Sequence, residues 1–193
     1  MRVLVIDETP LRASILEEGL REAGLEDVTI LSETRLLMRQ IVEIDPDVIL
    51  IDLENPSRDV LESMFQVSRT VERPIGMFVD QSDAGMIERA VEAGVSTYIV
   101  DGLRKERVKA IVEMTVSRFN AFNRLKRELA DTKRALADRT SIDRAKAILM
   151  RRHTIDEPAA YAMLRRAAMD QHQTIADVAR ALVSASQLLE KRP

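Results

Sequence analysis

The sequence predicts an α/β domain with a five-stranded parallel sheet, followed by a long helix and a small all-α domain. Three observations support this prediction. Short apolar runs alternate with amphipathic stretches over the first hundred residues. Residues 103–137 then contain no glycine, no proline and no strand-like run. The charge also changes, because residues 1–101 hold 9 Arg, no Lys and 21 acidic residues, whereas residues 102–193 hold 20 basic and 11 acidic residues. Such asymmetry indicates two modules, the second suited to a polyanion.

Five apolar runs are expected to form the sheet. They are continuous rather than alternating, which is typical of strands buried on both faces. They are Val3–Asp7, Val28–Leu31, Asp47–Asp52, Ile75–Val79 and Thr97–Val100.

Amphipathic helices are expected between these strands. Gly24 and Gly94 end two of them, and Pro46 and Pro74 follow the other two. Alternating strands and helices at this spacing favour the flavodoxin-like doubly wound order, with helices on both faces. The four helices are expected at Leu11–Ala23, Glu33–Ile44, Arg58–Val71 and Ala84–Ala93.

The segment from Leu103 to Ala137 is predicted to be one long helix. Its apolar residues recur at alternating spacings of three and four, which is the heptad pattern of a coiled coil, with Thr132 and Arg139 as polar interruptions. A parallel homodimer is favoured, and an antiparallel hairpin with the C-terminal helices is the alternative. The predicted dimer seam is Phe122, Leu125, Leu129 and Leu136.

Three short helices are expected to complete the chain, at Ser141–Arg152, Glu157–Gln171 and Ile175–Glu190. Asp156 and Thr174 are good N-cap residues for the second and third. We therefore divide the chain into an α/β domain at 1–110, a coiled-coil helix at 111–138 and an all-α domain at 139–193.

Composition excludes several classes of site. The chain has no Cys and only two His, so disulfides, thiolate chemistry and a histidine zinc site are not expected. No apolar run is long enough to span a bilayer, and nothing resembles a signal peptide. We expect a cytoplasmic protein with no membrane partner.

Carboxylates follow two strands that are neighbours in the predicted order. Asp7 and Glu8 follow the first strand, and Asp52 ends the third. Ligands bind at the carboxyl ends of the strands in such sheets, and clustered carboxylates favour a hard cation such as Mg²⁺. The sequence therefore predicts a metal site formed by Asp7, Glu8 and Asp52. An Asp beside Mg²⁺ can also accept a phosphoryl group.

The runs VLVIDE, DVILIDLENP and AGVSTYIV resemble the receiver domain of bacterial response regulators. The resemblance implies that Asp52 is the phosphoacceptor. This sequence departs from the family pattern in two places: Val79 stands where receivers have Thr or Ser, and Asp101 where they have Lys. Both changes disfavour phosphorylation, so the domain is expected to act as a docking and dimerisation surface.

Arg and Lys cluster on the C-terminal helices. Only Tyr161 is aromatic there, so a stacking platform is not expected and recognition of a nucleic acid must use cations. The candidate RNA contacts are Arg144, Lys146, Arg151, Arg165 and Arg166. Solvated helix faces are the alternative for the arginine pairs.

The segments SIDRAKAILM and AYAMLRRAAM resemble the ANTAR domain of AmiR- and NasT-type regulators. The sequence of the receiver-like part resembles the NasT nitrate/nitrite regulators in particular. The resemblance implies a dimer that binds the paired hexanucleotide loops of leader RNA and prevents termination by RNA polymerase. It also implies control by a ligand-binding sensor protein, with a histidine kinase as the alternative.

The sequence therefore predicts an RNA-binding antiterminator with no enzyme activity. Two rivals stay open. One is a phosphorylation-dependent response regulator that binds DNA, and the other is a protein-interaction adaptor whose basic tail binds an acidic partner.

Overall fold

The computed structural model describes residues 1–33, 36–53, 57–101 and 103–190. The chain forms two compact units, Met1–Arg124 and Leu125–Pro193. Each unit is described by itself.

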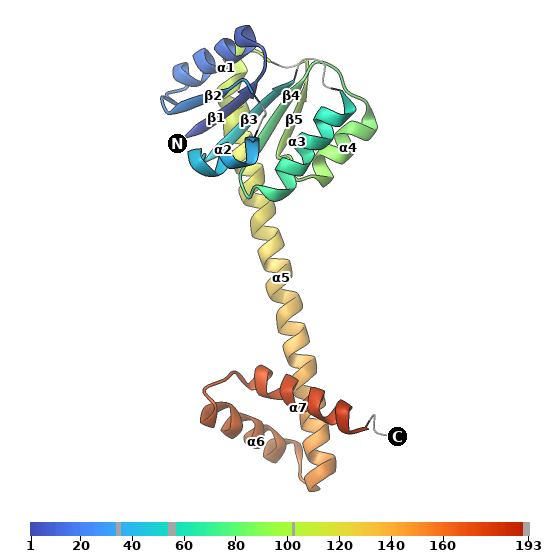
Figure 1. The fold of residues 1–193 in the computed structure, drawn as a ribbon. Coiled ribbons are helices and arrows are strands. Elements are labelled where there is room, and N and C mark those ends of the chain that lie inside the picture. Colours follow the sequence, from blue (N-terminus) through green and yellow to red (C-terminus); the bar gives the residue numbers. More distant parts are fainter. Residues whose placement is uncertain (34–35, 54–56, 102, 191–193) are drawn as a thin grey trace. The chain divides into compact units, whose positions relative to one another are not determined.

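The first unit is built on a five-stranded parallel sheet (Figure 1). Its order is β2-β1-β3-β4-β5, which confirms the predicted flavodoxin-like topology. The middle strands β1, β3 and β4 are buried along their whole length because helices cover both faces, as their continuous apolar sequences predicted. The strands are β1 (Val3–Asp7), β2 (Val28–Leu31), β3 (Val48–Leu53), β4 (Ile75–Val79) and β5 (Thr97–Val100).

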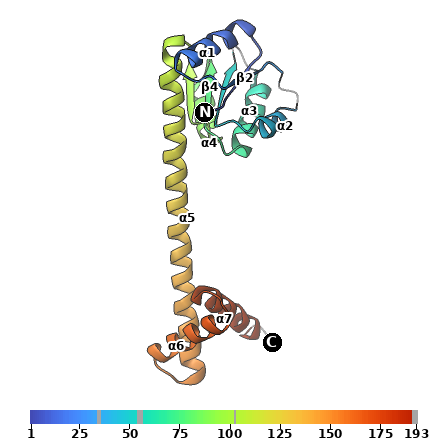
Figure 2. The ribbon, with the colours of Figure 1, turned by 90° about the vertical axis from the view of Figure 1, so that its left-hand side faces the viewer.

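Two helical layers enclose the sheet, as Figure 2 shows from the side. One core cluster joins the sheet to α1 (Pro10–Glu22) and to the beginning of α5 (Val108–His153). The other joins it to α2 (Leu37–Ile44), α3 (Arg58–Thr70) and α4 (Ala84–Glu92). Gly24 and Gly94 follow α1 and α4 with φ angles of 80° and 87°, which is why glycine ends these helices.

The start of α5 is held tightly against α1. A short 3₁₀ turn, η1 (Lys105–Arg107), precedes α5, and the Lys105 ammonium group contacts Glu18 at 3.0 Å and Glu22 at 2.6 Å. A Cβ atom added to Gly19 would lie 2.9 Å from the Lys105 carbonyl oxygen and 2.9 Å from Val108. The close approach of these two elements therefore requires glycine at this position.

One prediction about the helices is wrong. We expected a break near residue 138 and a new helix at Ser141, but α5 runs unbroken for 46 residues, from Val108 to His153. Thr140 and Ser141 donate their hydroxyl groups to the carbonyls of Leu136 and Ala137 within the helix. These side chains tolerate a mid-helix position in this way, so no break is needed.

The second unit packs α6 (Glu157–Asp170) and α7 (Ile175–Glu190) on the end of α5. Asp156 caps α6 by accepting the Ala159 amide at 3.0 Å, and Thr174 and Asp177 exchange hydrogen bonds at the start of α7, as the capping pattern predicted. The core is thin because its members are small. Its buried residues are Ala145, Leu149, Ala160, Leu164 and Ala179.

Candidate functional site

Two predicted site residues meet at the carboxyl edge of the sheet. Asp7 ends β1, Asp52 lies near the end of β3, and the two are direct partners in the parallel register. Both are buried, with 2% and 1% of their surface exposed. The Thr9 backbone amide donates a hydrogen bond of 2.7 Å to Asp7. The topology therefore places two buried carboxylates side by side.

A residue that the sequence did not identify closes this site. Arg12, in the first turn of α1, donates from Nε to one Asp52 oxygen at 2.8 Å and from Nη2 to the other at 2.7 Å. Its remaining nitrogen, Nη1, donates to Asp80 at 2.9 Å. The Arg12 side chain is 18% exposed. Its pKa is raised, chiefly by the hydrogen bonds to Asp52, so the guanidinium stays charged.

The buried position of Asp7 changes its acidity. Burial raises its pKa to about 6, and the neighbouring charge on Asp52 adds to the rise, while the Thr9 amide and Arg12 oppose it. One oxygen of Asp7, Oδ2, is buried and has no hydrogen-bond partner among the described residues. Asp7 therefore takes up a proton more readily than an ordinary aspartate.

The three predicted metal ligands do not form a metal site as they lie. Glu8 is exposed on the surface, and among the described residues no group of three His, Asp or Glu side chains is placed to hold a metal ion. Mg²⁺ needs nearly octahedral oxygen coordination, whereas both Asp52 oxygens face the Arg12 guanidinium. The arrangement fits a buried ion pair better than a divalent cation.

The two departures from the receiver pattern contribute no compensating group here. Val79 is a buried apolar residue at the end of β4, and Asp101 is exposed just after β5. Among the described residues, Arg12 supplies the cation that contacts Asp52. Sequence reasoning missed Arg12 and Asp80 because charged residues on an amphipathic helix and in a loop are usually solvated. The signal was the place of Arg12, in the first turn of a helix that starts at the acidic edge.

In the second unit, one predicted RNA contact is held by the protein itself. The Lys146 ammonium group lies 2.8 Å from Asp143 and 2.6 Å from Glu157, and its side chain is 16% exposed. These hydrogen bonds, first that to Asp143, raise the pKa of Lys146. Lys146 therefore connects α5 to the first turn of α6.

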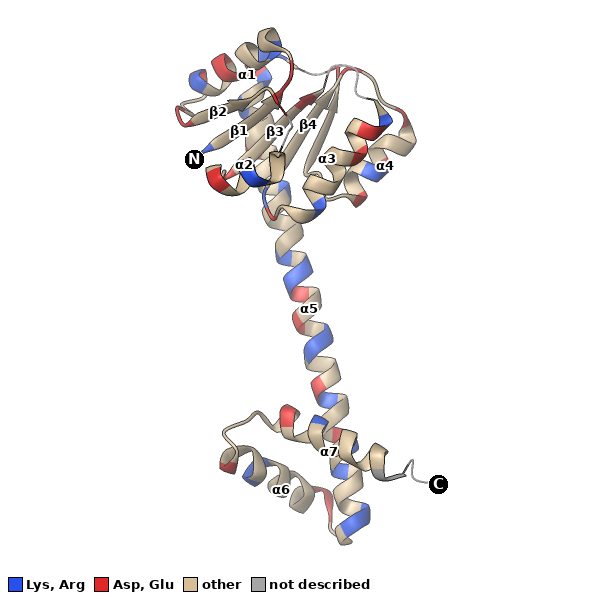
Figure 3. Ribbon diagram, in the orientation of Figure 1, with Lys and Arg blue, Asp and Glu red and all other residues tan. Residues whose placement is uncertain are grey.

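The other predicted RNA contacts are exposed. Arg165 and Arg166 lie on α6, and no ion pair to an acidic side chain is found for them or for Arg144 within the described ranges. Figure 3 shows Lys and Arg recurring along α5 and on α6. Arg144 and Arg151 also border a groove between α5 and α7 with a volume of about 250 Å³. The groove is lined by Arg144, Ala147, Ile148, Arg151, Val183, Ser186 and Gln187.

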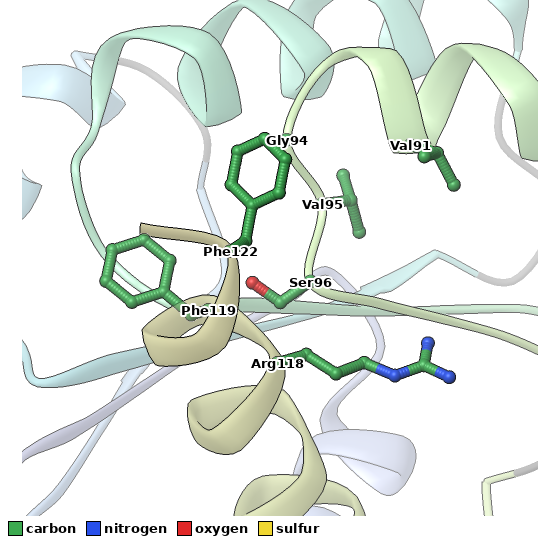
Figure 4. Close-up of a pocket in the computed structure, with 7 residues that line it drawn as sticks. All are labelled: Val91, Gly94, Val95, Ser96, Arg118, Phe119 and Phe122. Carbon is green, nitrogen blue, oxygen red and sulfur yellow. The ribbon is translucent and has the colours of Figure 1, made fainter. Parts of the chain in front are cut away.

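The predicted dimer seam is exposed in the single chain. Phe122, Leu125, Leu129 and Leu136 all lie on α5 with 55–67% of their surface accessible. Phe122 also borders an apolar cavity of about 260 Å³ in the first unit, together with Phe119 and residues at the end of α4 (Figure 4). Apolar side chains exposed at coiled-coil spacing are typical of a helix that pairs with another.

Comparison with protein families matches both units. A model of the response regulator receiver domain matches residues 3–113, and a model of the ANTAR domain matches residues 130–183. No helix in the described residues is long and apolar enough to cross a membrane.

Individual proteins that are similar to this chain agree with these two domain matches. The transcriptional regulatory protein PdtaR of Mycobacterium tuberculosis is 30% identical over 178 residues, which cover 92% of this chain and 87% of PdtaR. The nitrate regulatory protein of Klebsiella oxytoca is 32% identical over 85 residues, 44% of this chain and 22% of that protein. A response regulator from Thermotoga maritima has the same fold, with a TM-score of 0.53 and 17% identity over 60% of this chain and 97% of that one.

Proposed function

The chain belongs to the response regulators that join a receiver domain to an ANTAR domain, and on this basis we propose that it is an RNA-binding transcription antiterminator. The observation that carries the proposal is the exposed set of Arg144, Arg165 and Arg166, which lie within the ANTAR match and have no ion pair to an acidic side chain in the described part of the chain. Unpaired guanidinium groups suit a phosphate backbone, because they release bound counterions from the nucleic acid without first losing a protein partner.

The bound form in this proposal is a homodimer on a leader RNA with two hexanucleotide loops. Each ANTAR domain contacts one loop, and the exposed apolar residues of α5 join the two chains. Binding of the two loops prevents formation of the terminator, so that RNA polymerase continues. The protein acts in the cytoplasm and needs no enzyme activity for this role.

Control by a sensor protein is the proposed input, rather than phosphorylation by a histidine kinase. Two features support it: Asp52 is buried against Arg12, and the hydroxyl and lysine of ordinary receivers are replaced by Val79 and Asp101. Nitrate and nitrite assimilation genes are the proposed targets, which the partial similarity to the Klebsiella nitrate regulatory protein supports.

Substitution of the α6 arginines tests the function. The variant Arg165→Gln with Arg166→Gln should bind two-loop RNA at least ten-fold more weakly than the wild type, because two phosphate contacts are lost. The salt dependence of binding should fall as well. Arg39→Gln, which removes an exposed ion pair with Glu43 in the receiver, is the matched control and should bind normally.

Two results separate the rivals. If duplex DNA competes as well as the RNA at equal salt, the protein is a DNA-binding regulator. If neither nucleic acid binds above a nonspecific, steeply salt-dependent background, the basic unit serves as an adaptor for an acidic protein.

A further inference from the structure

The receiver pocket contains its own cation. A hard cation such as Mg²⁺, which binds oxygen ligands, can offset the charge repulsion between clustered carboxylates. Here Asp7, Asp52 and Asp80 surround the Arg12 guanidinium, which contacts Asp52 at 2.7 and 2.8 Å and Asp80 at 2.9 Å. A planar fork that meets both oxygens of one carboxylate is the strongest and most directional ion pair available to side chains.

This contact prevents a phosphoryl donor from reaching the Asp52 carboxylate. Phosphoryl transfer from a small donor such as acetyl phosphate forms a bond between an Asp52 oxygen and phosphorus and releases acetate. The reacting atoms must first approach to about 3–3.5 Å in line. The Asp52 side chain has no exposed surface, and both of its oxygens are occupied by Arg12. A donor therefore cannot reach Asp52 until Arg12 leaves.

The neighbouring groups hold Arg12 in place. Arg12 is in the first turn of α1, and the residue preceding this helix, Thr9, is tied to Asp7 through its backbone amide. Asp80 takes the guanidinium nitrogen that Asp52 leaves free. Release of Arg12 would leave the buried Asp7 and Asp52 side by side with no other counter-ion from the residues that the structure describes, which is strongly unfavourable.

We propose that Arg12 is a built-in cation that replaces the divalent metal of the receiver pocket, so that the domain keeps Asp52 neutralised and closed to phosphoryl donors without any ligand. The domain then holds one state whatever the supply of metal or phosphoryl donor. The inference concerns the first unit alone and does not depend on RNA binding.

Mg²⁺ dependence of stability tests the proposal. The melting temperature of the wild-type protein should not change between EDTA and millimolar Mg²⁺. In Arg12→Gln the freed carboxylates should bind Mg²⁺, and the melting temperature should be lower in EDTA and rise by about 3–6 °C with Mg²⁺. Arg39→Gln is the control, since it removes an arginine whose ion pair with Glu43 is exposed, and it should behave as the wild type.

Two further measurements use the wild-type chain, so that they stand even if Arg12→Gln does not fold. Calorimetric titration with Mg²⁺ should give no binding heat. Incubation with acetyl phosphate and Mg²⁺ should leave the intact mass unchanged. A Mg²⁺-dependent melting temperature in the wild type, heat of Mg²⁺ binding, or the added mass of a phosphoryl group that Asp52→Asn prevents would each overturn the proposal. So would a folded Arg12→Gln that gains no response to Mg²⁺.

Discussion

At the scale of single residues, Asp7 makes stability depend on pH. Its pKa is about 6 in the folded chain against 3.8 ordinarily, so the folded state holds a proton more readily than the unfolded state. The resulting stabilisation is complete below pH ~4 and is lost as pH rises to ~6, which costs on the order of 2–3 kcal/mol at neutral pH. Asp7→Asn should therefore be more stable than the wild type at pH 7 and not at pH 4. Urea unfolding in EDTA at both values measures this, and an equal difference at both would contradict it.

A second prediction for single residues concerns the role of Lys146 in RNA binding. Lys146→Ala should weaken RNA binding while the protein stays folded, because the cation lies within the basic unit. The ion pair with Glu157 offers another cause, since its loss would loosen the junction of α5 and α6. Glu157→Gln separates the two. It removes one of the two carboxylates that hold the ammonium group and leaves Asp143 in place, so direct contact predicts unchanged or tighter binding. A purely structural role predicts that both variants bind weakly. Filter binding across a salt series gives the comparison.

At the scale of elements, the contact between α1 and α5 depends on Gly19. Alanine is the better helix former by about 1 kcal/mol, but its Cβ would lie 2.9 Å from a backbone oxygen. Overpacking of this kind costs about 1–3 kcal/mol, so Gly19→Ala should lower the free energy of unfolding. Ser14→Ala, at an exposed site on the same helix, is the control and should be nearly neutral.

Two substitutions in the α5 seam should change the stability of the dimer in opposite directions. Leu129→Ser should weaken a dimer by about 2 kcal/mol per chain, because the buried apolar surface is lost. Thr132→Leu fills a polar interruption of the same stripe and should strengthen it. Sedimentation velocity over a concentration series measures both. A protein that stays monomeric throughout would contradict the seam.

The helices and strands also show which features of the fold could be predicted from the sequence. The strand order could be predicted because apolar runs alternate with helices at the spacing of a doubly wound sheet. The ends of α1 and α4 could be predicted because Gly24 and Gly94 end them locally. The continuity of α5 could not be predicted, because Thr140 and Ser141 favour helix ends but can also bond to carbonyls within a helix, as they do here. The pairing of Asp7 with Asp52 followed from topology, whereas that of Arg12 with Asp52 spans 40 residues and depends on a side-chain conformation that no periodicity encodes.

At the scale of the whole molecule, the chain joins an acidic receiver domain, in which Arg12 pairs with Asp52, to a basic ANTAR domain. The receiver supplies a stable surface and the α5 helix an exposed seam. In the proposed function, the unpaired arginines supply affinity for RNA. Each part has its own test, so that failure of one does not decide the others.

We propose that the unphosphorylated dimer binds two RNA loops at once. The most direct measurement is the affinity and stoichiometry of the full chain on a two-hexaloop leader RNA, against a single-loop RNA at the same physiological salt. We expect two chains per RNA and binding at least a hundred-fold tighter to the two-loop RNA, since the second loop is captured at high effective concentration. Equal affinity for the two RNAs, or binding only after treatment with acetyl phosphate, would contradict the account.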